Sequence, residues 1–298
     1  MGLRTIAILS PGDMGHGVGR ALADRGYTVT TCLAGRSERT RGLAARAGFV
    51  DAPSLEELVA GSDLIMSILP PARAVDLARE VAGAMRATGA ARPFADCNAV
   101  SPRTASEIAA LIGAAGGDFI DAGIIGRSPA VGAVPRIYTS GPRAVLMDEI
   151  DGAGVAVRNL GPSIGRASGL KMCYAALTKG TGALQLAMLA AAEALGLYDE
   201  LWEELGQSQG ATLAAVESSI PFVRQNAGRW VGEMEQIAET FDAAGVTPRF
   251  HQGAAEIFEV VAAASERDRA ADGGGAAALH GTIRAIAARL EEPGPAAG

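Results

Sequence analysis

Short apolar runs alternate with helical periodicity over the first half of this chain. An apolar run flanked by turn residues is typical of a buried strand, and the periodic segments between such runs are typical of crossover helices. The strand-like runs are Ile6–Leu9, Tyr27–Leu33, Leu64–Leu69, Pro93–Cys97 and Asp118–Ala122, with further candidates at Arg136–Ser140 and Val155–Asn159. The helical stretches lie near residues 14–25, 38–47, 54–61, 72–87 and 102–114. This alternation predicts βαβ units that build a mainly parallel sheet.

The pattern changes after Gly165. From there the chain carries few strand-like runs and long segments rich in Ala and Leu, near residues 167–195, 198–206, 222–243 and 252–267. The sequence therefore predicts an α/β N-terminal domain over residues 1–164 and an all-α C-terminal domain over residues 165–298. We expect residues 271–275 to form a flexible loop and residues 291–298 a frayed tail.

Charge and cysteine content exclude several classes of protein. A net charge of -7 over 298 residues offers no broad basic surface for nucleic acid or an anionic membrane. Cys32, Cys97 and Cys173 are widely spaced, so we expect no disulfide, no zinc or other metal site, and a cytoplasmic location. The apolar segment 183–197 contains Glu193 and is shorter than the roughly 20 residues that a bilayer requires, which favours a buried helix.

The turn after the first strand has the sequence Ser10-Pro11-Gly12-Asp13-Met14-Gly15 and leads into a helix. A helix N-terminus presents unpaired N–H groups and a partial positive charge, which suit a pyrophosphate. Gly12 permits close approach of the phosphates, and Gly15 permits close packing of the helix on the strand. We therefore predict a Rossmann-like domain in which Pro11, Gly12, Asp13 and Met14 contact a dinucleotide. Because Ser10 replaces the usual first glycine and Pro11 has no N–H, a strand-to-helix turn without a ligand is the alternative.

The second strand is followed by Gly35-Arg36-Ser37-Glu38-Arg39, where an NAD enzyme normally carries an acid for the ribose 2′-hydroxyl. Guanidinium groups bind phosphate through two charge-assisted hydrogen bonds. Arg36, Ser37 and Arg39 therefore predict contacts with a 2′-phosphate, and NADP as the cofactor rather than NAD. The alternative is a solvated helix start.

With these segments in view, the chain resembles the β-hydroxyacid dehydrogenase superfamily, which includes 3-hydroxyisobutyrate and 6-phosphogluconate dehydrogenases. Four landmarks in order carry the resemblance: Ile6–Gly15, Ile68–Pro70, Asp96–Pro102 and Gly161–Lys171. The resemblance implies that Leu69, Pro70 and Asn98 contact the cofactor. It also implies a homodimer that forms through the helical domain.

The resemblance assigns the role of general acid and base to Lys171. The chain contains only two lysines, Lys171 and Lys179. A desolvated lysine can exchange a proton near neutral pH, which arginine does not do. Lys179 is turned roughly 80° away from Lys171 on the same helix, so we expect it to be a surface or snorkelling lysine.

Several positions depart from the family pattern. Tyr174 stands where the family has a substrate-orienting asparagine, and it offers a hydroxyl to catalysis and substrate binding. Ile125 replaces a substrate-facing serine, and Gly126 and Arg127 follow it, with Arg127 either receiving a substrate carboxylate or facing solvent. His251 is a candidate second polar contact, with a structural histidine as the alternative. The substrate is therefore expected to differ from 3-hydroxyisobutyrate and 6-phosphogluconate.

The later part of the chain points to a subgroup of the superfamily. The run Arg229–Ala238 resembles a subgroup whose helical domain has no known function. Apolar residues spaced at helical intervals in this part are expected to form core or a dimer interface: Phe222, Trp230, Met234 and Ile237.

Together the residues and the resemblance predict an NADP-dependent oxidoreductase. It would transfer a hydride between nicotinamide and a small hydroxy acid or a related carbonyl compound. Two alternatives stay open: an imine reductase-like enzyme, which Tyr174 supports but Lys171 argues against, and a non-catalytic NADP-binding protein.

Overall fold

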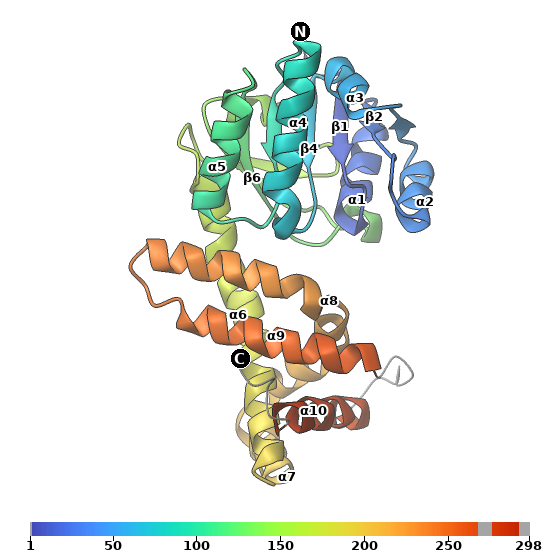
Figure 1. Cartoon of the computed structure of the whole chain (residues 1–298). Coiled ribbons are helices and arrows are strands. Elements are labelled where there is room, and N and C mark those ends of the chain that lie inside the picture. The colour runs from blue at the N-terminus through green and yellow to red at the C-terminus, as the bar shows by residue number, and fades with distance from the viewer. Residues whose placement is uncertain (1, 268–275, 292–298) are drawn as a thin grey trace, which may run out of the picture. The chain divides into compact units, whose positions relative to one another are not determined.

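A computed structural model describes residues 2–267 and 276–291 of the chain. The chain forms two compact units, one up to Cys173 and one from Tyr174 onward (Figure 1). The domain boundary near residue 164 stays a prediction. The predicted loop at 271–275 lies outside the described residues, as does the predicted tail at 291–298 apart from Glu291, which is helical.

The first unit is built on an eight-stranded sheet in the order β3-β2-β1-β4-β5-β6-β7-β8. All neighbouring strands are parallel except β6 and β7. The strands are β1 Thr5–Leu9, β2 Thr28–Thr31, β3 Val50–Asp51, β4 Leu64–Ser67, β5 Phe94–Asp96, β6 Phe119–Ile125, β7 Arg136–Ser140 and β8 Ala156–Asn159. The predicted, mainly parallel sheet is confirmed, and the short strand β3 is an addition to the expected set.

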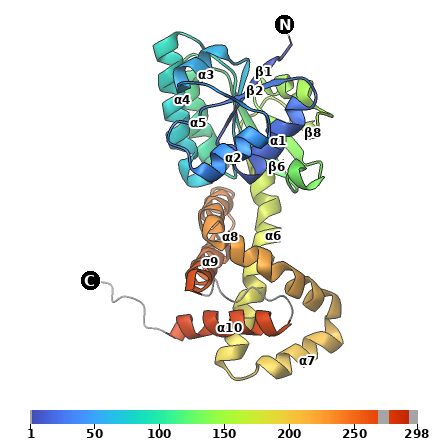
Figure 2. The same cartoon turned by 90° about the vertical axis from the view of Figure 1, so that its right-hand side faces the viewer.

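Helices connect these strands and cover the sheet on both sides. They are α1 Asp13–Ala23, α2 Glu38–Arg46, α3 Leu55–Gly61, α4 Ala74–Thr88 and α5 Pro102–Gly113, with 3-10 helices η1 Pro71–Arg73, η2 Pro129–Val131 and η3 Ala144–Ile150. Figure 2 shows α4 and α5 on one side of the sheet and α1 on the other.

Strand β1 shows why the strands appear in the sequence as continuous apolar runs. Its residues point alternately to the two faces of the sheet. Ile6 and Ile8 join the apolar cluster beneath α1 and η3, whereas Ala7 and Leu9 join the cluster beneath α3, α4 and α5. Burial on both faces is what a parallel sheet between two helical layers requires.

The second unit is helical throughout its described residues, in agreement with the predicted all-α region. Its helices are the later part of α6 Arg166–Ala194, followed by α7 Tyr198–Ser208, α8 Gly210–Ala243, α9 Arg249–Arg267 and α10 Ala276–Glu291. Helix α8 begins well before the predicted residue 222, and α10 was not predicted. None of the helices in the described part of the chain has the length and apolarity that crossing a membrane requires.

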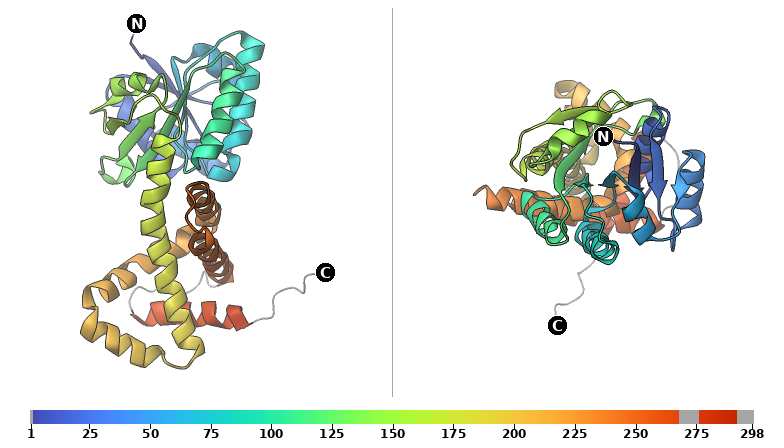
Figure 3. Two further views of the ribbon diagram at one scale, coloured as in Figure 1. Left: turned by 90° about the vertical axis from the view of Figure 1, so that its left-hand side faces the viewer. Right: turned by 90° about the horizontal axis from the view of Figure 1, so that it is seen from above.

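The core of the second unit lies where α8 packs against α9 (Figure 3). Trp230, Met234 and Ile237 are buried on one face of α8, which confirms the core alternative for these three residues. The ring of Trp230 meets that of Phe258 on α9 edge to face, with centroids 5.3 Å apart. Phe222, from the same predicted stripe, is exposed.

Helix α1 packs so closely on β1 that position 15 has no room for a side chain. A Cβ atom at Gly15 would lie 2.9 Å from the carbonyl oxygen of Ser10 and 3.4 Å from Cγ2 of Ile8. The sequence-based role of Gly15 in helix packing is therefore confirmed. Gly83, in the interior of α4, has no atom within 4 Å of its Cβ position.

We expect Gly15→Ala and Gly83→Ala to change stability in opposite directions. The clash with a backbone carbonyl at position 15 should cost about 1–3 kcal/mol of the free energy of unfolding. At position 83 alanine should add about 1 kcal/mol, because it favours the helix more than glycine does. Urea unfolding of both variants and the wild type measures the difference. Equal midpoints for the two variants would contradict the packing described for α1.

Candidate functional site

The turn after β1 begins with a serine in a left-handed conformation, at the position where the family motif has its first glycine. Ser10 has φ of 63°, and it is the one non-glycine residue with positive φ in the part of the chain described by the structure. This left-handed conformation costs a residue with a Cβ about 1–2 kcal/mol. The N–H of Gly12 donates to the carbonyl of Ser10 at 2.7 Å, which closes the turn. Ser10 is therefore held in a conformation that glycine would adopt without this cost.

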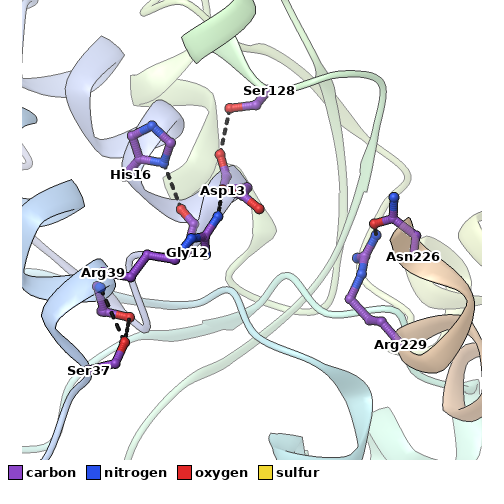
Figure 4. Close-up of polar contacts among 9 residues, drawn as sticks. Gly12, Asp13, His16, Ser37, Arg39, Ser128, Asn226 and Arg229 are labelled. Atoms are coloured by element: carbon purple, nitrogen blue, oxygen red, sulfur yellow. Dashed lines mark hydrogen bonds and ion pairs between the residues drawn. The ribbon is translucent and has the colours of Figure 1, made fainter. Parts of the chain in front are cut away.

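The N-terminus of α1 has no side-chain cap. Gly12 is the N-cap residue, and no side chain accepts a hydrogen bond from the first turn. Two other contacts hold the turn from behind (Figure 4): Nδ1 of His16 donates to the Gly12 carbonyl at 2.8 Å, and the Ser128 hydroxyl donates to the Asp13 carbonyl at 2.8 Å. An uncapped helix start on a held turn fits the pyrophosphate of a dinucleotide.

The segment after β2 contacts this turn through one ion pair. Nη2 of Arg39 donates to Oδ1 of Asp13 at 2.5 Å, and both side chains are exposed (Figure 4). Ser37 is the N-cap of α2, because its hydroxyl accepts from the N–H of Thr40 at 3.3 Å. Arg36 is half-buried at the end of the same loop. The structure thus brings the two predicted cofactor segments together.

Asn98 joins the ends of β4 and β5. Its side-chain oxygen accepts from the N–H of Leu69 at 2.6 Å, and its amide nitrogen donates to Ser67 Oγ at 2.8 Å and to Asp96 Oδ2 at 2.9 Å. Both amide hydrogens are therefore used within the protein. Asn98 is buried and fixes the loop of Leu69 and Pro70 from below.

Two buried carboxylates lie side by side on β5 and β6. Asp96 and Asp121 are partners in the register of these strands. Burial raises the pKa of Asp96 to about 7, with a smaller contribution from the charge of Asp121, while hydrogen bonds from Asn98 oppose the rise. Burial also raises the pKa of Asp121 above its ordinary value, against hydrogen bonds from Ser140, Ser168 and Gly165. Neither acid was predicted from the sequence to have a role of its own.

Lys171 lies on α6 beside the carboxyl end of β6. Its Nζ donates to the carbonyl oxygen of Ile124 at 2.7 Å, and the side chain is half-buried. Because β1, β4, β5 and β6 are parallel, this end of β6 lies on the same edge of the sheet as the turn after β1. Lys171 therefore shares an edge with the predicted cofactor segments.

The predicted substrate residues fall into two groups. In the first unit, Ile125 is buried at the end of β6, Gly126 has φ of 125°, and Arg127 is exposed. Tyr174 and His251 belong to the second unit. No three Cys, His, Asp or Glu side chains gather as a metal site would require within residues 2–267 and 276–291.

The two predicted residues of the second unit have different surroundings. Tyr174 is 46% exposed, whereas His251 is 7% exposed. The His251 ring packs edge to face on Phe241 with centroids 4.3 Å apart, and its buried Nδ1 has no hydrogen-bond partner among the described residues. Burial lowers the pKa of His251, which favours the neutral imidazole.

Of the two environments expected for Lys179, surface or snorkelling, the surface one is wrong. Lys179 forms a partly buried ion pair with Glu233 of α8, and its Nζ lies 5.7 Å from the centre of the Trp230 ring. Arg229 contacts the same carboxylate at 3.2 Å and donates to Asn226 at 3.0 Å (Figure 4). The partner is 54 residues away in the chain, so local helical geometry did not indicate it.

A parallel sheet with an uncapped, glycine-rich helix start beyond its first strand defines a dinucleotide-binding α/β protein. Residues 5–148 match the NAD binding domain of 6-phosphogluconate dehydrogenase, and residues 192–261 match a domain of unknown function, DUF1932. An uncharacterized 28.5 kDa protein in the 7S RNA 5′ region of Methanothermus fervidus is 32% identical over 182 residues, which are 61% of this chain and 68% of that protein. The chain belongs to this family, which joins a 6-phosphogluconate dehydrogenase-type NAD(P)-binding domain to a DUF1932 domain.

Solved structures share the fold. The conserved protein MTH1747, described as structurally similar to 3-hydroxyacid dehydrogenases, is 28% identical with a TM-score of 0.63, over 86% of this chain and 96% of that one. The 3-hydroxyisobutyrate dehydrogenase of Mycobacterium tuberculosis is 21% identical with a TM-score of 0.66, over 88% and 94%. An imine reductase of Myxococcus stipitatus, in complex with NADP+, is 21% identical with a TM-score of 0.53, over 89% and 95%. The fold is thus shared with NAD(P)-dependent dehydrogenases and reductases.

Proposed function

We propose that this protein is an NADP-dependent oxidoreductase that acts on a small hydroxy acid or a related carbonyl compound, with Lys171 as general acid and base. One observation carries the proposal. The amine of Lys171 is held 2.7 Å from the Ile124 carbonyl, at the edge of the sheet that also carries the uncapped start of α1. Open α/β sheets bind their ligands beyond the carboxyl ends of the strands.

The residues of the chain have separate roles in this proposed reaction. When bound, the nicotinamide supplies or accepts the hydride. Lys171 donates a proton to the substrate oxygen during reduction and accepts it during oxidation. The carbonyl of Ile124 fixes the position of this amine. Pro11, Gly12, Asp13 and Met14 hold the pyrophosphate on the helix start, while Asn98 keeps Leu69 and Pro70 in place against the cofactor.

We assign substrate binding to five further residues. Arg127 is exposed and can pair with a carboxylate, and Gly126 gives the backbone room to turn toward the substrate. Ile125 contributes an apolar wall, while Tyr174 offers a hydroxyl that takes part in catalysis and His251 a second polar contact. A carboxylate-bearing hydroxy acid matches this set better than a neutral sugar does.

Replacement of Lys171 should abolish proton transfer and preserve cofactor binding. We expect Lys171→Ala to lower turnover by a factor on the order of a hundred or more with an unchanged Kd for NADPH. Lys171→Arg is the matched control, because it keeps the positive charge but cannot exchange a proton near neutral pH. Turnover assays on a panel of hydroxy acids measure the loss. Wild-type turnover in either variant would remove Lys171 from the chemistry.

The cofactor preference rests on Arg36, Ser37 and Arg39. The ion pair between Arg39 and Asp13 is exposed, and such pairs contribute about 0–1 kcal/mol. A 2′-phosphate can therefore take the place of the Asp13 carboxylate at little cost. Bidentate hydrogen bonds to a dianionic phosphate favour the exchange.

Arg39→Ala should discriminate between the two nicotinamide cofactors. We expect the Kd for NADPH to rise about tenfold, the effect of losing one charge-assisted contact, and the Kd for NADH to stay the same. Arg79→Ala is the matched control, since Arg79 forms an exposed pair with Asp76 on α4. Fluorescence titration gives the Kd of both cofactors for the wild type and for each variant. An equal loss of affinity for both cofactors would contradict the assignment.

We also propose that the protein forms a homodimer through the helical unit. On α6 an apolar stripe is exposed: Leu177 is 70% exposed and Leu184, two turns further on, is 69% exposed, with Tyr174 on the same face. A two-fold interface uses the same patch on both subunits, so one continuous stripe suffices.

We further propose a cytoplasmic location. Cys32, Cys97 and Cys173 are free thiols, and cysteines stay reduced in the cytoplasm.

Charge introduced into the α6 stripe should separate the subunits. We expect the double variant Leu177→Glu/Leu184→Glu to have the mass of a monomer in light scattering, because each interface would bury four carboxylates. Val145→Glu, at an exposed apolar position on η3, is the matched control and should leave the mass of a dimer. A dimeric mass for the double variant would show that the stripe is not the interface.

A second candidate function is the reduction of imines. The exposed Tyr174, one turn beyond Lys171, offers a phenol as an alternative proton donor. A panel of cyclic imines and hydroxy acids, followed at the nicotinamide absorbance, distinguishes the two reactions. Tight NADPH binding without turnover of either class would instead identify a non-catalytic NADP-binding protein.

A further inference from the structure

A buried carboxylate caps the helix that carries Lys171. Oδ2 of Asp121 accepts hydrogen bonds from the backbone N–H groups of Gly165 at 2.9 Å, Ala167 at 3.1 Å and Ser168 at 3.2 Å. These groups belong to the start of α6, where N–H donors have no partner within the helix. Asp121 comes from β6, so the cap joins elements that are far apart in sequence.

Two serines complete the cap. The hydroxyl of Ser140 donates to Asp121 Oδ2 at 2.8 Å and accepts from the N–H of Ala167 at 3.0 Å. The hydroxyl of Ser168 donates to the same carboxylate oxygen at 3.3 Å. The side chains of Asp121, Ser140 and Ser168 are all buried. The first turn of α6 is therefore fixed to β6 and β7 by a buried polar cluster that uses Oδ2 of Asp121, while Oδ1 has no hydrogen-bond partner among the described residues.

The next residues of β6 hold Lys171 itself. A Cβ atom at Gly123 would lie 2.9 Å from Cβ of Lys171 and 3.1 Å from the carbonyl oxygen of Ala167, so α6 lies directly on the backbone of β6. The carbonyl of the following residue, Ile124, accepts from Lys171 Nζ. Positions 121, 123 and 124 of one strand thus meet successive turns of one helix.

We infer that Asp121 is the positioning residue of Lys171: its carboxylate sets the register of α6 on β6 and supplies the negative charge beneath the helix that carries the amine. The inference rests on the proposed role of Lys171. A negative charge at the start of a helix offsets the positive end of its dipole, which would otherwise disfavour an ammonium group on the first turns. Asp96 and the buried thiol of Cys97 also lie within electrostatic range of Asp121.

The test uses the fact that Lys171 and Lys179 are the only lysines in the chain. In protein labelled with 13C-lysine, NMR resolves two side-chain signals, which Lys179→Arg assigns. We expect Asp121→Asn to lower the titration midpoint of the Lys171 signal by about one pH unit, the effect of removing one nearby charge from a partly buried site. The signal of Lys179 serves as an internal reference and should not move.

Asp63→Asn is the matched control. Asp63 accepts from the N–H groups of Arg4 and Thr5 at 2.9 Å each, at the amino ends of the strands and hence at the opposite edge of the sheet. Asp63→Asn should leave the titration midpoint of Lys171 at its wild-type value. Asp121→Glu keeps the negative charge, so its Lys171 midpoint should lie closer to the wild-type value than that of Asp121→Asn. An unchanged Lys171 midpoint in folded Asp121→Asn would overturn the inference.

Ser140→Ala provides a milder variant if Asp121→Asn does not fold. It removes two hydrogen bonds of the cap and keeps the carboxylate, so we expect a shifted Lys171 signal at constant pH and a several-fold loss of turnover with an unchanged Kd for NADPH. A wild-type signal and wild-type turnover would overturn the inference. The proposed function fails separately, through unimpaired turnover of Lys171→Ala, and that result leaves the NMR measurement unaffected.

Discussion

Parallel pairing of β1, β4, β5 and β6 is the constraint on which the candidate site depends. Parallel strands place their carboxyl ends on one edge of the sheet, and the hydrogen-bond ladder fixes how far each strand extends. The turn after β1, the loop of Leu69, the side chain of Asn98 and the amine of Lys171 meet this edge from four separate stretches of sequence. Each is then held by contacts to a neighbouring strand end, as when Asn98 binds the N–H of Leu69.

Backbone geometry at this edge persists where the familiar residues have changed. Ser10 adopts the left-handed conformation of a glycine because the strand before it and the helix after it are both fixed by packing. The hydroxyl of Ser37 and the carboxylate of Asp121 each cap a helix start, at α2 and at α6. Caps and backbone conformation thus hold the shape of this edge, and the proposed substrate residue Arg127 is exposed beside it.

Sequence reasoning succeeded where local chemistry alone decides the structure. The long strands were found because burial on both faces demands an unbroken apolar run, whereas the two exposed residues of β3 carry no such signal. Helix α10 was missed although Leu279, Ile283 and Ile286 recur at helical spacing and are buried, because a predicted loop precedes it and many of its other residues are alanines. In the second unit Lys179 was misjudged, since only the approach of α8 supplies Glu233 as its partner.

The amino-acid sequence by itself determined the alternation of strands and helices, the change to an all-helical chain and the positions of the glycine-containing turn after β1 and of Lys171. These features depend on periodicity, glycine spacing and residue type, which act over a few neighbours. Only the tertiary structure decided three further contacts. Asp121 caps the lysine-bearing helix, the side-chain oxygen of Asn98 accepts a hydrogen bond from the N–H of Leu69, and His251 is buried against Phe241. Such contacts join residues far apart in the chain, and they exist only once the packed elements have excluded water from between them.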